Sequence, residues 1–317
     1  MSIPALTVCV VTYERPAYLR RCLEAIEMLD DPVDEVVVVD ASAENHGAVA
    51  REACPLVDYV WAPHLAGWMT RSRNEALRRV QGDVIAFIDD DVCVRPGWSR
   101  ALRHAFYDPG LAAAGGRTLN GLPGEEDNDE PVGRYFPDGS LTGNFAARQA
   151  APIEIDHGIG ANMSFRRSVL ADLGGFRDDY PGTAFREDTD VFLRIKAIGG
   201  RALFLPDAVV DHLPAPHVVG KRFDTRYKLY ARRNHAVLLA RHAGIRSPTL
   251  RRWALRELAR VREVAGMQDR VLRLGVTLVG LAWGAGAAVL SARWGPTNPR
   301  RRDALGRELR AALGGDR

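Results

Sequence analysis

Three consecutive aspartates, Asp89 to Asp91, directly follow the apolar run Val84–Ile88. A run of five apolar residues is typical of a strand buried on both faces of a parallel sheet. Ligands of open α/β sheets bind at the carboxyl ends of such strands. Three carboxylates that leave a buried strand together repel one another unless a cation lies among them, and hard divalent cations prefer carboxylate oxygen. The triplet therefore predicts a metal or phosphate-linked site, and the alternative is a polar turn that ends the strand.

Other polar residues of chemical interest also follow predicted strands or open a predicted helix. Each has a structural alternative as well, because acids are common at helix N-termini and a lone histidine often serves a structural role at a strand end. These residues are Thr12-Tyr13-Glu14-Arg15 after the strand Ala5–Val11, Asp40-Ala41-Ser42 after the strand Glu35–Val39, Glu187-Asp188 at the start of a helix, and His212 after a late strand.

The elements that position these residues alternate between strands and helices. This alternation predicts a parallel sheet with helices on both faces. Residues 117–157 then form a long acidic loop, which is either functional or a surface insertion. The further elements that we predict are the strands Val57–Trp61, Ala202–Leu205 and Ala208–Val210, the helices Pro16–Met28, Thr70–Val80, Arg167–Leu173, Glu187–Ile198 and Phe223–His242, and a helix that starts at Pro96.

Composition places the chain among ordinary globular proteins. Its 317 residues are 46% hydrophobic and 26% charged, enough for one large domain with an appendage or for two domains. The cysteines show no paired spacing, so we expect a reduced, cytosolic protein without disulfides. No basic segment followed by an apolar core opens the sequence, which argues against a signal peptide.

The C-terminal part of the chain differs sharply in charge from the rest. From Arg246 onward there are 15 Arg and 6 acidic residues, a net charge of +9, so residues 1–245 carry −6 of the total +3. A basic amphipathic helix is expected from Leu250 to Ala265. The 19 uncharged residues Leu274–Ala292 then approach the ~20 that span a bilayer. Both flanks are basic, including Arg300-Arg301-Arg302, which disfavours a single span.

We therefore expect an interfacial or re-entrant membrane segment at residues 274–292, and the alternative is a buried helix or a dimer contact. Nucleic-acid binding is not expected, because the aromatic residues that would stack on bases are sparse in the basic tail.

Seven stretches, taken in order over residues 5–243, resemble family 2 glycosyltransferases of the GT-A fold. They are VVTYERPAYLRRCLEAI, VVVVDAS, SRNEALRRVQGDVIAFIDDDV, GANMSFRR, LGGF, REDTDVFLRI and the strand ending VVDH. The resemblance implies a Rossmann-like, mostly parallel sheet with flanking helices in residues 1–215. Residues 1–91 would bind the nucleotide sugar and residues 92–215 would form the acceptor and catalytic half. Residues 216–317 would be a basic helical extension.

The same resemblance implies roles for individual residues. Asp91 and His212 would bind a divalent metal, Mn²⁺ or Mg²⁺. Asp188, with Glu187 beside it, would be the catalytic carboxylate that takes the proton of the acceptor hydroxyl. Asp40 would accept from a base N–H, which favours UDP or dTDP as the nucleotide. The donor-binding set would be Thr12, Tyr13, Glu14, Arg15, Asp40, Ser42, Arg73, Asp89, Asp90, Gly160 and Asn162.

The implied function is inverting, metal-dependent transfer of a sugar from a nucleoside-diphosphate sugar to a hydroxyl of a glycan, lipid-linked or natural-product acceptor. The enzyme would act in the cytoplasm at the inner face of the membrane, with peripheral contact through its tail and homodimer formation as an option. A sugar nucleotidyltransferase is a weaker alternative, because the first strand is followed by TYERP and not by a Gly-rich loop. A non-catalytic scaffold that docks through its basic tail is the other alternative.

Overall fold

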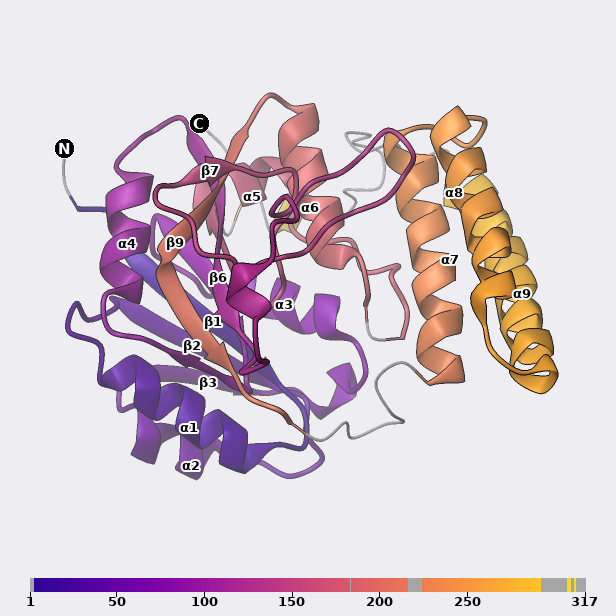
Figure 1. The fold of residues 1–317 in the computed structure, drawn as a ribbon. Helices are drawn as coiled ribbons and strands as arrows, with labels where there is room; N and C mark the ends of the chain where they lie inside the picture. The colour runs from indigo at the N-terminus through magenta and orange to yellow at the C-terminus, as the bar shows by residue number, and fades with distance from the viewer. Residues whose placement is uncertain (1–2, 183, 216–223, 292–306, 309–310, 312–317) are drawn as a thin grey trace.

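The computed structural model describes residues 3–182, 184–215, 224–291, 307–308 and 311 (Figure 1). An α/β body carries most of the chain, and the helices of residues 225–291 stand beside it, at the right of the view (Figure 1). One mixed sheet runs through the body in the order β3-β2-β1-β4-β8-β6-β9-β5, with β7 paired to β9. The expected α/β class and the flanking helices are confirmed.

The N-terminal half is the parallel part of the sheet. Three of its four strands are rich in Val and other apolar residues and almost entirely buried, as expected for strands covered on both faces, whereas the edge strand Val57–Trp61 is partly exposed. Thr12 pairs in register with Asp40, and Val11 pairs with Asp89, so the polar residues after three strands meet at one edge. The elements are β1 (Leu6–Thr12), α1 (Pro16–Glu27), β2 (Glu35–Asp40), α2 (Gly47–Ala53), β3 (Val57–Trp61), α3 (Met69–Leu77) and β4 (Val84–Asp89).

The second half departs from the predicted parallel pattern. β8 lies antiparallel between β4 and β6, and β5 pairs antiparallel with β9. Two short strands were predicted around Pro206, but β9 is continuous and follows β6 through a register shift at Gly116. The elements are β5 (Val92–Val94), α4 (Trp98–Phe106), β6 (Leu111–Leu119), β7 (Ile153–Glu154), β8 (Asn162–Arg166), α5 (Arg167–Leu173), α6 (Glu187–Ala197) and β9 (Arg201–His212).

Two apolar layers hold the body together, one on each face of the sheet. One layer joins α1, α2 and α4 to the strands through residues such as Leu23, Ala50 and Trp98. The other joins α3, α5 and α6 to them through residues such as Leu77 and Ile195. The active-site edge is therefore held on strands that are fixed from both sides.

The C-terminal helices are α7 (Thr225–His242), α8 (Pro248–Ala259) and α9 (Met267–Ser291). Asp224 caps α7 by accepting from the backbone N–H of Tyr227, and Ser247 caps α8 by accepting from that of Leu250. Gly280 and Gly284 of α9 lie directly against α7. The basic flank Arg300–Arg302 and Ala292 lie outside the described residues.

Candidate active site

A cluster of three potential metal ligands forms where β4, β5 and β9 meet. Asp89 ends β4, and Asp91 lies in the turn between β4 and β5. Val92 of β5 pairs opposite His212, the last residue of β9, and this register brings His212 beside Asp91. One ligand atom from each of Asp89, Asp91 and His212 lies within 4.8 Å of the others. Two carboxylates and one imidazole suit Mn²⁺ well and Mg²⁺ less well.

The tautomer of His212 fits a metal ligand. Its Nδ1 lies 3.0 Å from Asn120 Oδ1. An amide oxygen only accepts, so Nδ1 carries the proton and donates it. Nε2 then presents a lone pair toward Asp91 Oδ1, which is 3.3 Å away. Two acceptors that face each other at this distance require a cation or a proton between them, and a histidine held through its other nitrogen is the usual arrangement of a metal ligand.

Asp90 has a different environment from its two neighbours. Its carboxylate accepts from Thr12 Oγ1 at 2.7 Å and from Arg15 Nη1 at 3.1 Å. Burial raises the pKa of Asp90 to about 7, although Thr12 and Arg15 oppose the shift. Arg15 also donates to Asp91 at 2.9 Å. We expected both Asp89 and Asp90 to bind the donor, with one of them at the ribose or at a metal-bound water; the structure places Asp89 with the ligand cluster and Asp90 inside the turn.

Asp40 is fully buried, contrary to the expectation that it meets a base. Its Oδ1 accepts from the backbone N–H of Ser42 at 2.8 Å. Its Oδ2 accepts from Tyr59 Oη at 2.7 Å and lies 2.9 Å from His46 Nδ1. No atom of the side chain is exposed. The structure therefore removes the basis for preferring a uracil or thymine nucleotide.

The turns after β1 and β2 are tied to each other. Glu14 has a left-handed backbone with φ of 57°. Its N–H donates to Ser42 Oγ at 2.7 Å, and its carboxylate accepts from the N–H of Ala43 at 2.8 Å. Tyr13 is partly buried beside them. The expected donor-binding residues Thr12 to Arg15 and Ser42 thus form one connected rim at the strand ends.

Arg73 was expected to approach the diphosphate, but it is buried beneath the site. Its guanidinium pairs with Glu187, lies 3.3 Å from Asp89 Oδ1 and donates to the carbonyl of Gly160 at 3.4 Å. The rings of Phe87 and Phe176 lie within 6 Å of it. Arg73 therefore connects the metal-ligand cluster to the start of α6.

Glu187 and Asp188, adjacent in sequence, have different environments. Burial raises the pKa of Glu187 to about 7, against the opposing charge of Arg73. Glu187 is therefore the ion-pair partner of Arg73. This position does not support a direct catalytic role for Glu187. Asp188 is partly buried. Its Oδ2 accepts from the N–H of Gly160 at 3.1 Å, and its Oδ1 accepts from the N–H of Thr189 at 2.6 Å.

Asn162 supports the site from below and does not face it. Its Nδ2 donates to the carbonyls of Ala208 at 2.9 Å and Arg117 at 3.2 Å, and its Oδ1 accepts from Trp98 Nε1 at 3.0 Å. The residue is buried and its amide is fully engaged. Gly160 does lie at the site, where a Cβ would approach Arg73 Nη2 to 3.0 Å, so a larger residue there would press on the ion pair.

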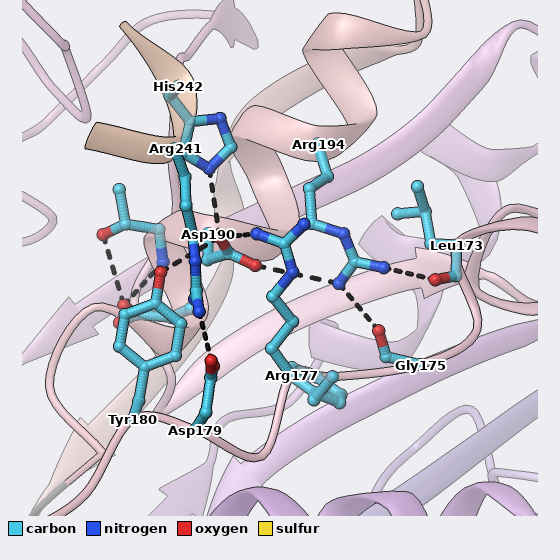
Figure 2. A network of polar contacts seen from close by, with 12 residues as sticks. Leu173, Gly175, Arg177, Asp179, Tyr180, Asp190, Arg194, Arg241 and His242 are labelled. Atoms are coloured by element: carbon cyan, nitrogen blue, oxygen red, sulfur yellow. Dashed lines mark hydrogen bonds and ion pairs between the residues drawn. The ribbon is translucent and has the colours of Figure 1, made fainter. Parts of the chain in front are cut away.

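A buried polar network fixes α6 from its far side (Figure 2). Asp190 accepts from Arg177 Nη1 and Tyr180 Oη and lies against His242 Nε2, each at 3.0 Å. Burial would raise the pKa of Asp190, but Arg177, His242 and Arg194 hold it well below its usual range. Since His242 comes from α7, the C-terminal extension helps to hold the helix that carries Asp188.

Sequence reasoning missed several residues of the site. Asn120 orients His212, Tyr59 and His46 hold Asp40, and Arg186 lies directly before the acidic pair. Asn120 lies in a long loop and Tyr59 in a weakly apolar strand, so neither had a local signal. The sequence shows Arg186 in the stretch REDTD, but its hydrogen-bond partner His235 belongs to α7 and could not be predicted.

Comparison with known proteins agrees with this geometry. Residues 7–174 match the sequence family described as glycosyl transferase family 2. A pre-mycofactocin glycosyltransferase from Mycobacterium tuberculosis is 28% identical over 222 residues, which cover 65% of this chain and only 42% of the relative. The succinoglycan biosynthesis protein ExoM from Rhizobium meliloti is 30% identical, with 65% and 66% covered.

Solved structures share the fold. A mannosyltransferase from Pyrobaculum calidifontis in complex with GDP-Man and Mn²⁺ has a TM-score of 0.55 at 21% identity, covering 93% of this chain and 88% of that one. GalNAc-T7 with UDP, GalNAc and Mn²⁺ has a TM-score of 0.62 at 13% identity, covering 92% and 58%. At these identities the likeness shows the GT-A fold.

Proposed function

The chain belongs to glycosyl transferase family 2, and from this premise we propose that it transfers a sugar from a nucleoside-diphosphate sugar to a hydroxyl acceptor with inversion and with a divalent metal. The observation that carries the proposal is the cluster of Asp89, Asp91 and His212 at the strand ends, joined by Arg73 to the helix that starts with Asp188. A donor-side metal site and an acceptor-side base are the two parts that this reaction needs.

The residues that would hold the metal are Asp89, Asp91 and His212. When bound, the ion supplies Lewis acidity that stabilises the negative charge of the departing diphosphate. Arg15 lies beside both Asp90 and Asp91 and offsets part of their charge. Asn120 keeps the imidazole of His212 in the tautomer that directs a lone pair to the site.

Asp188 would act as the general base. As the acceptor oxygen forms its bond to C1 of the sugar, the C1–O bond to the diphosphate breaks and the hydroxyl proton passes to the Asp188 carboxylate. Attack from the face opposite the diphosphate inverts C1. The N–H groups of Gly160 and Thr189 orient the carboxylate, and the positive end of the α6 dipole favours its ionised form.

We also propose that the extension docks on the cytoplasmic face of a membrane. By length and composition, Met267–Leu290 is the one segment in the described part of the chain that could cross a bilayer. α9 packs along α7, however, and α7 is tied to the body by Arg241 with Asp179 and by His242 with Asp190. Charged contacts of this kind do not enter hydrocarbon without a high cost. Binding along the surface is therefore favoured over a span.

The free face of α9 has the chemistry of such a contact. Arg251, Arg252, Arg262 and Arg270 are exposed nearby on the extension, where they would meet anionic headgroups. Large apolar side chains are exposed along α9 itself, namely Val271, Leu272, Leu278, Val279, Trp283, Val289 and Leu290. Sedimentation with phosphatidylcholine vesicles, with and without phosphatidylglycerol, tests this contact. We expect binding to the anionic vesicles alone, weakened by salt and by Leu278→Glu, and equal recovery in both pellets would contradict it.

The test of the enzymatic function is a panel of nucleotide sugars incubated with the full chain and Mn²⁺, with released nucleoside diphosphate as the readout. We expect release from one donor class, loss of release with EDTA, and loss with Asp91→Ala. A scaffold would bind without releasing nucleotide. A nucleotidyltransferase would instead form pyrophosphate from a sugar phosphate and a nucleoside triphosphate.

A further inference from the structure

Arg186 is the residue next to the acidic pair whose side chain the proposed reaction leaves unused. It precedes α6 with a left-handed backbone, φ of 80°. A non-glycine residue in this region is strained, and such residues are common at functional sites. The strained backbone directs the Arg186 side chain to one side of α6 while Glu187 extends toward Arg73.

The guanidinium of Arg186 is held firmly by groups that do not neutralise it. Its Nε donates to His235 Nδ1 at 2.9 Å, and its Cζ lies 4.1 Å from the ring centre of Phe185. His235 in turn lies 2.8 Å from the carbonyl of Gly139, which can only accept, so the proton of the ring is on Nε2. His235 stacks on Trp253 of α8, with 4.6 Å between ring centres. The extension thus fixes the position of Arg186.

Among the described residues, the charge of Arg186 lacks the carboxylate partner that Arg73, Arg103 and Arg241 have. Arg73 pairs with Glu187, Arg103 with Asp31 and Arg241 with Asp179. Across the part of the chain that the structure describes, no carboxylate forms an ion pair with Arg186. Burial lowers the pKa of Arg186 to about 10, with Asp188 opposing the shift. A partly buried cation that is held by a neutral histidine and an aromatic ring is costly unless an anion joins it.

The location of this charge separates it from the donor site. Glu187 and Arg73 face the metal-ligand cluster, where the diphosphate would bind. Arg186 faces α7 and the loop at Gly139. The charge of Asp188 opposes the lowering of the pKa of Arg186, so an anion on Arg186 would lie near the base, on the side of α6 that faces α7. A guanidinium fork matches the oxygens of phosphate and carboxylate.

We infer that Arg186 binds an oxyanion group, a phosphate or a carboxylate, that the acceptor carries close to the attacking hydroxyl. The inference rests on the proposed function, because it takes Asp188 as the base that the acceptor approaches. It narrows the acceptor from any hydroxyl compound to an anionic one. His235 is then a positioning residue, since it acts on the acceptor through Arg186.

The test is a binding experiment in EDTA with three matched probes: phenyl phosphate, phenyl glucuronide and the neutral phenyl glucoside. Titration calorimetry of the full chain should show at least tenfold tighter binding of one of the anions than of phenyl glucoside. Arg186→Gln should remove this preference, and Arg186→Lys should retain part of it. Whichever anion binds more tightly identifies the group. Arg100→Gln, on an exposed arginine paired with Asp30, should match the wild type.

The inference is overturned if neither anion binds better than phenyl glucoside, or if Arg186→Gln binds the anions as the wild type does. Circular dichroism and the thermal midpoint of each variant show whether the chain is folded, and Arg186→Lys supplies a second variant if Arg186→Gln is not. Because the probes are titrated without metal or donor, this outcome is independent of the nucleotide-release assay. If nucleotide is released but no anion is preferred, the transferase assignment holds and the inference that the acceptor is anionic is wrong.

Discussion

His212 Nε2 lies 3.3 Å from Asp91 Oδ1, while the opposite ring nitrogen is held by Asn120. The pairing of β5 with β9 creates this relationship, because Val92 stands opposite His212. Asn120 in the loop and Asp91 in the turn thereby hold the imidazole of His212, at the end of β9, in one tautomer. This arrangement suits the cation that the proposed function requires, and cation binding can be measured apart from catalysis.

Asn120→Ala should weaken Mn²⁺ binding by about tenfold or more, as loss of a partner that orients a metal-bound histidine usually does. His212→Ala should weaken it further. Titration of the nucleotide-bound protein with Mn²⁺, followed by calorimetry, measures both. His104→Ala, on an exposed histidine of α4, is the control and should bind as the wild type does. Unchanged affinity in His212→Ala would exclude His212 as a ligand.

Asp188→Asn should reduce kcat by about 10²- to 10⁴-fold, the usual contribution of a general base, while the affinity for nucleotide and Mn²⁺ stays the same. The amide keeps the size of the carboxylate, and its single oxygen can accept from the N–H of either Gly160 or Thr189, but not from both. Glu187→Gln should lose less activity, because Glu187 lies in the ion pair with Arg73. Single-turnover kinetics with saturating donor distinguish the two. A wild-type rate in Asp188→Asn would assign the base elsewhere.

Arg73→Leu should lower the free energy of unfolding by about 3–5 kcal/mol, since removing one partner of a buried pair leaves uncompensated charge. Glu187→Gln should cost less, because Arg73 keeps Asp89 and the carbonyl of Gly160. Urea unfolding at pH 8 measures both. Arg20→Leu breaks an exposed pair with Glu52 and should change little. Equal effects of Arg73→Leu and Arg20→Leu would mean that the buried pair contributes no more than a surface one.

The buried histidines should make a contribution to stability that falls as the pH drops below about 6.5, whereas Asp90 and Glu187, whose pKa values burial raises to about 7, contribute in the opposite direction. Burial lowers the pKa of His157, His235 and His242. Below the ordinary histidine value near 6.5, the unfolded chain therefore binds protons that the folded chain does not, and protonation favours unfolding. Each such group contributes a slope of up to about 1.4 kcal/mol per pH unit. Thermal midpoints of the wild type and of His235→Gln between pH 8 and pH 5 test this. Relative to the wild type, His235→Gln should become more stable as the pH falls, and a difference that does not change with pH would contradict the prediction.

Two glycines of α9 form a matched pair for testing how closely it packs on α7. A Cβ at Gly284 would lie 2.7 Å from Ala236 Cβ, whereas a Cβ at Gly286 meets nothing within 4 Å. Gly286→Ala should stabilise the chain by up to about 1 kcal/mol through helix propensity. Gly284→Ala should destabilise it, because the two helices must separate. Thermal unfolding of both variants tests this prediction. A change of the same sign in both thermal midpoints would contradict the observed contact.

The sequence was sufficient to predict the strands that converge on the site. β1, β2 and β4 are continuous apolar runs, and the polar residues after each run mark the edge where ligands bind. Asp89 and Asp91 follow from that pattern alone. The direction of β8 could not be predicted in this way, because the pattern of the five residues from Asn162 does not distinguish a parallel from an antiparallel strand. Its antiparallel placement depends on the pairing with β4 and β6.

The contacts of individual side chains could not be predicted from the sequence. Asp40 looked available for a base, but Tyr59 and His46 enclose it from other elements. Arg73 was expected among the donor-binding residues, yet it extends under the sheet edge to Glu187, 114 positions away. Such contacts depend on tertiary packing, so neither propensity nor periodicity could reveal them.

The bonds between α7 and the body have a consequence for how the enzyme can diversify. His242 completes the shell of Asp190, Arg241 pairs with Asp179, and His235 holds Arg186. α8 and α9 form fewer such bonds to the body, and the main ion pair joins Arg256 to Asp138. Recombination that replaced residues from about 246 onward would therefore keep these three bonds of α7 but lose the stacking of Trp253 on His235. A junction placed before α7 would lose the bonds to Asp190, Asp179 and Arg186 as well.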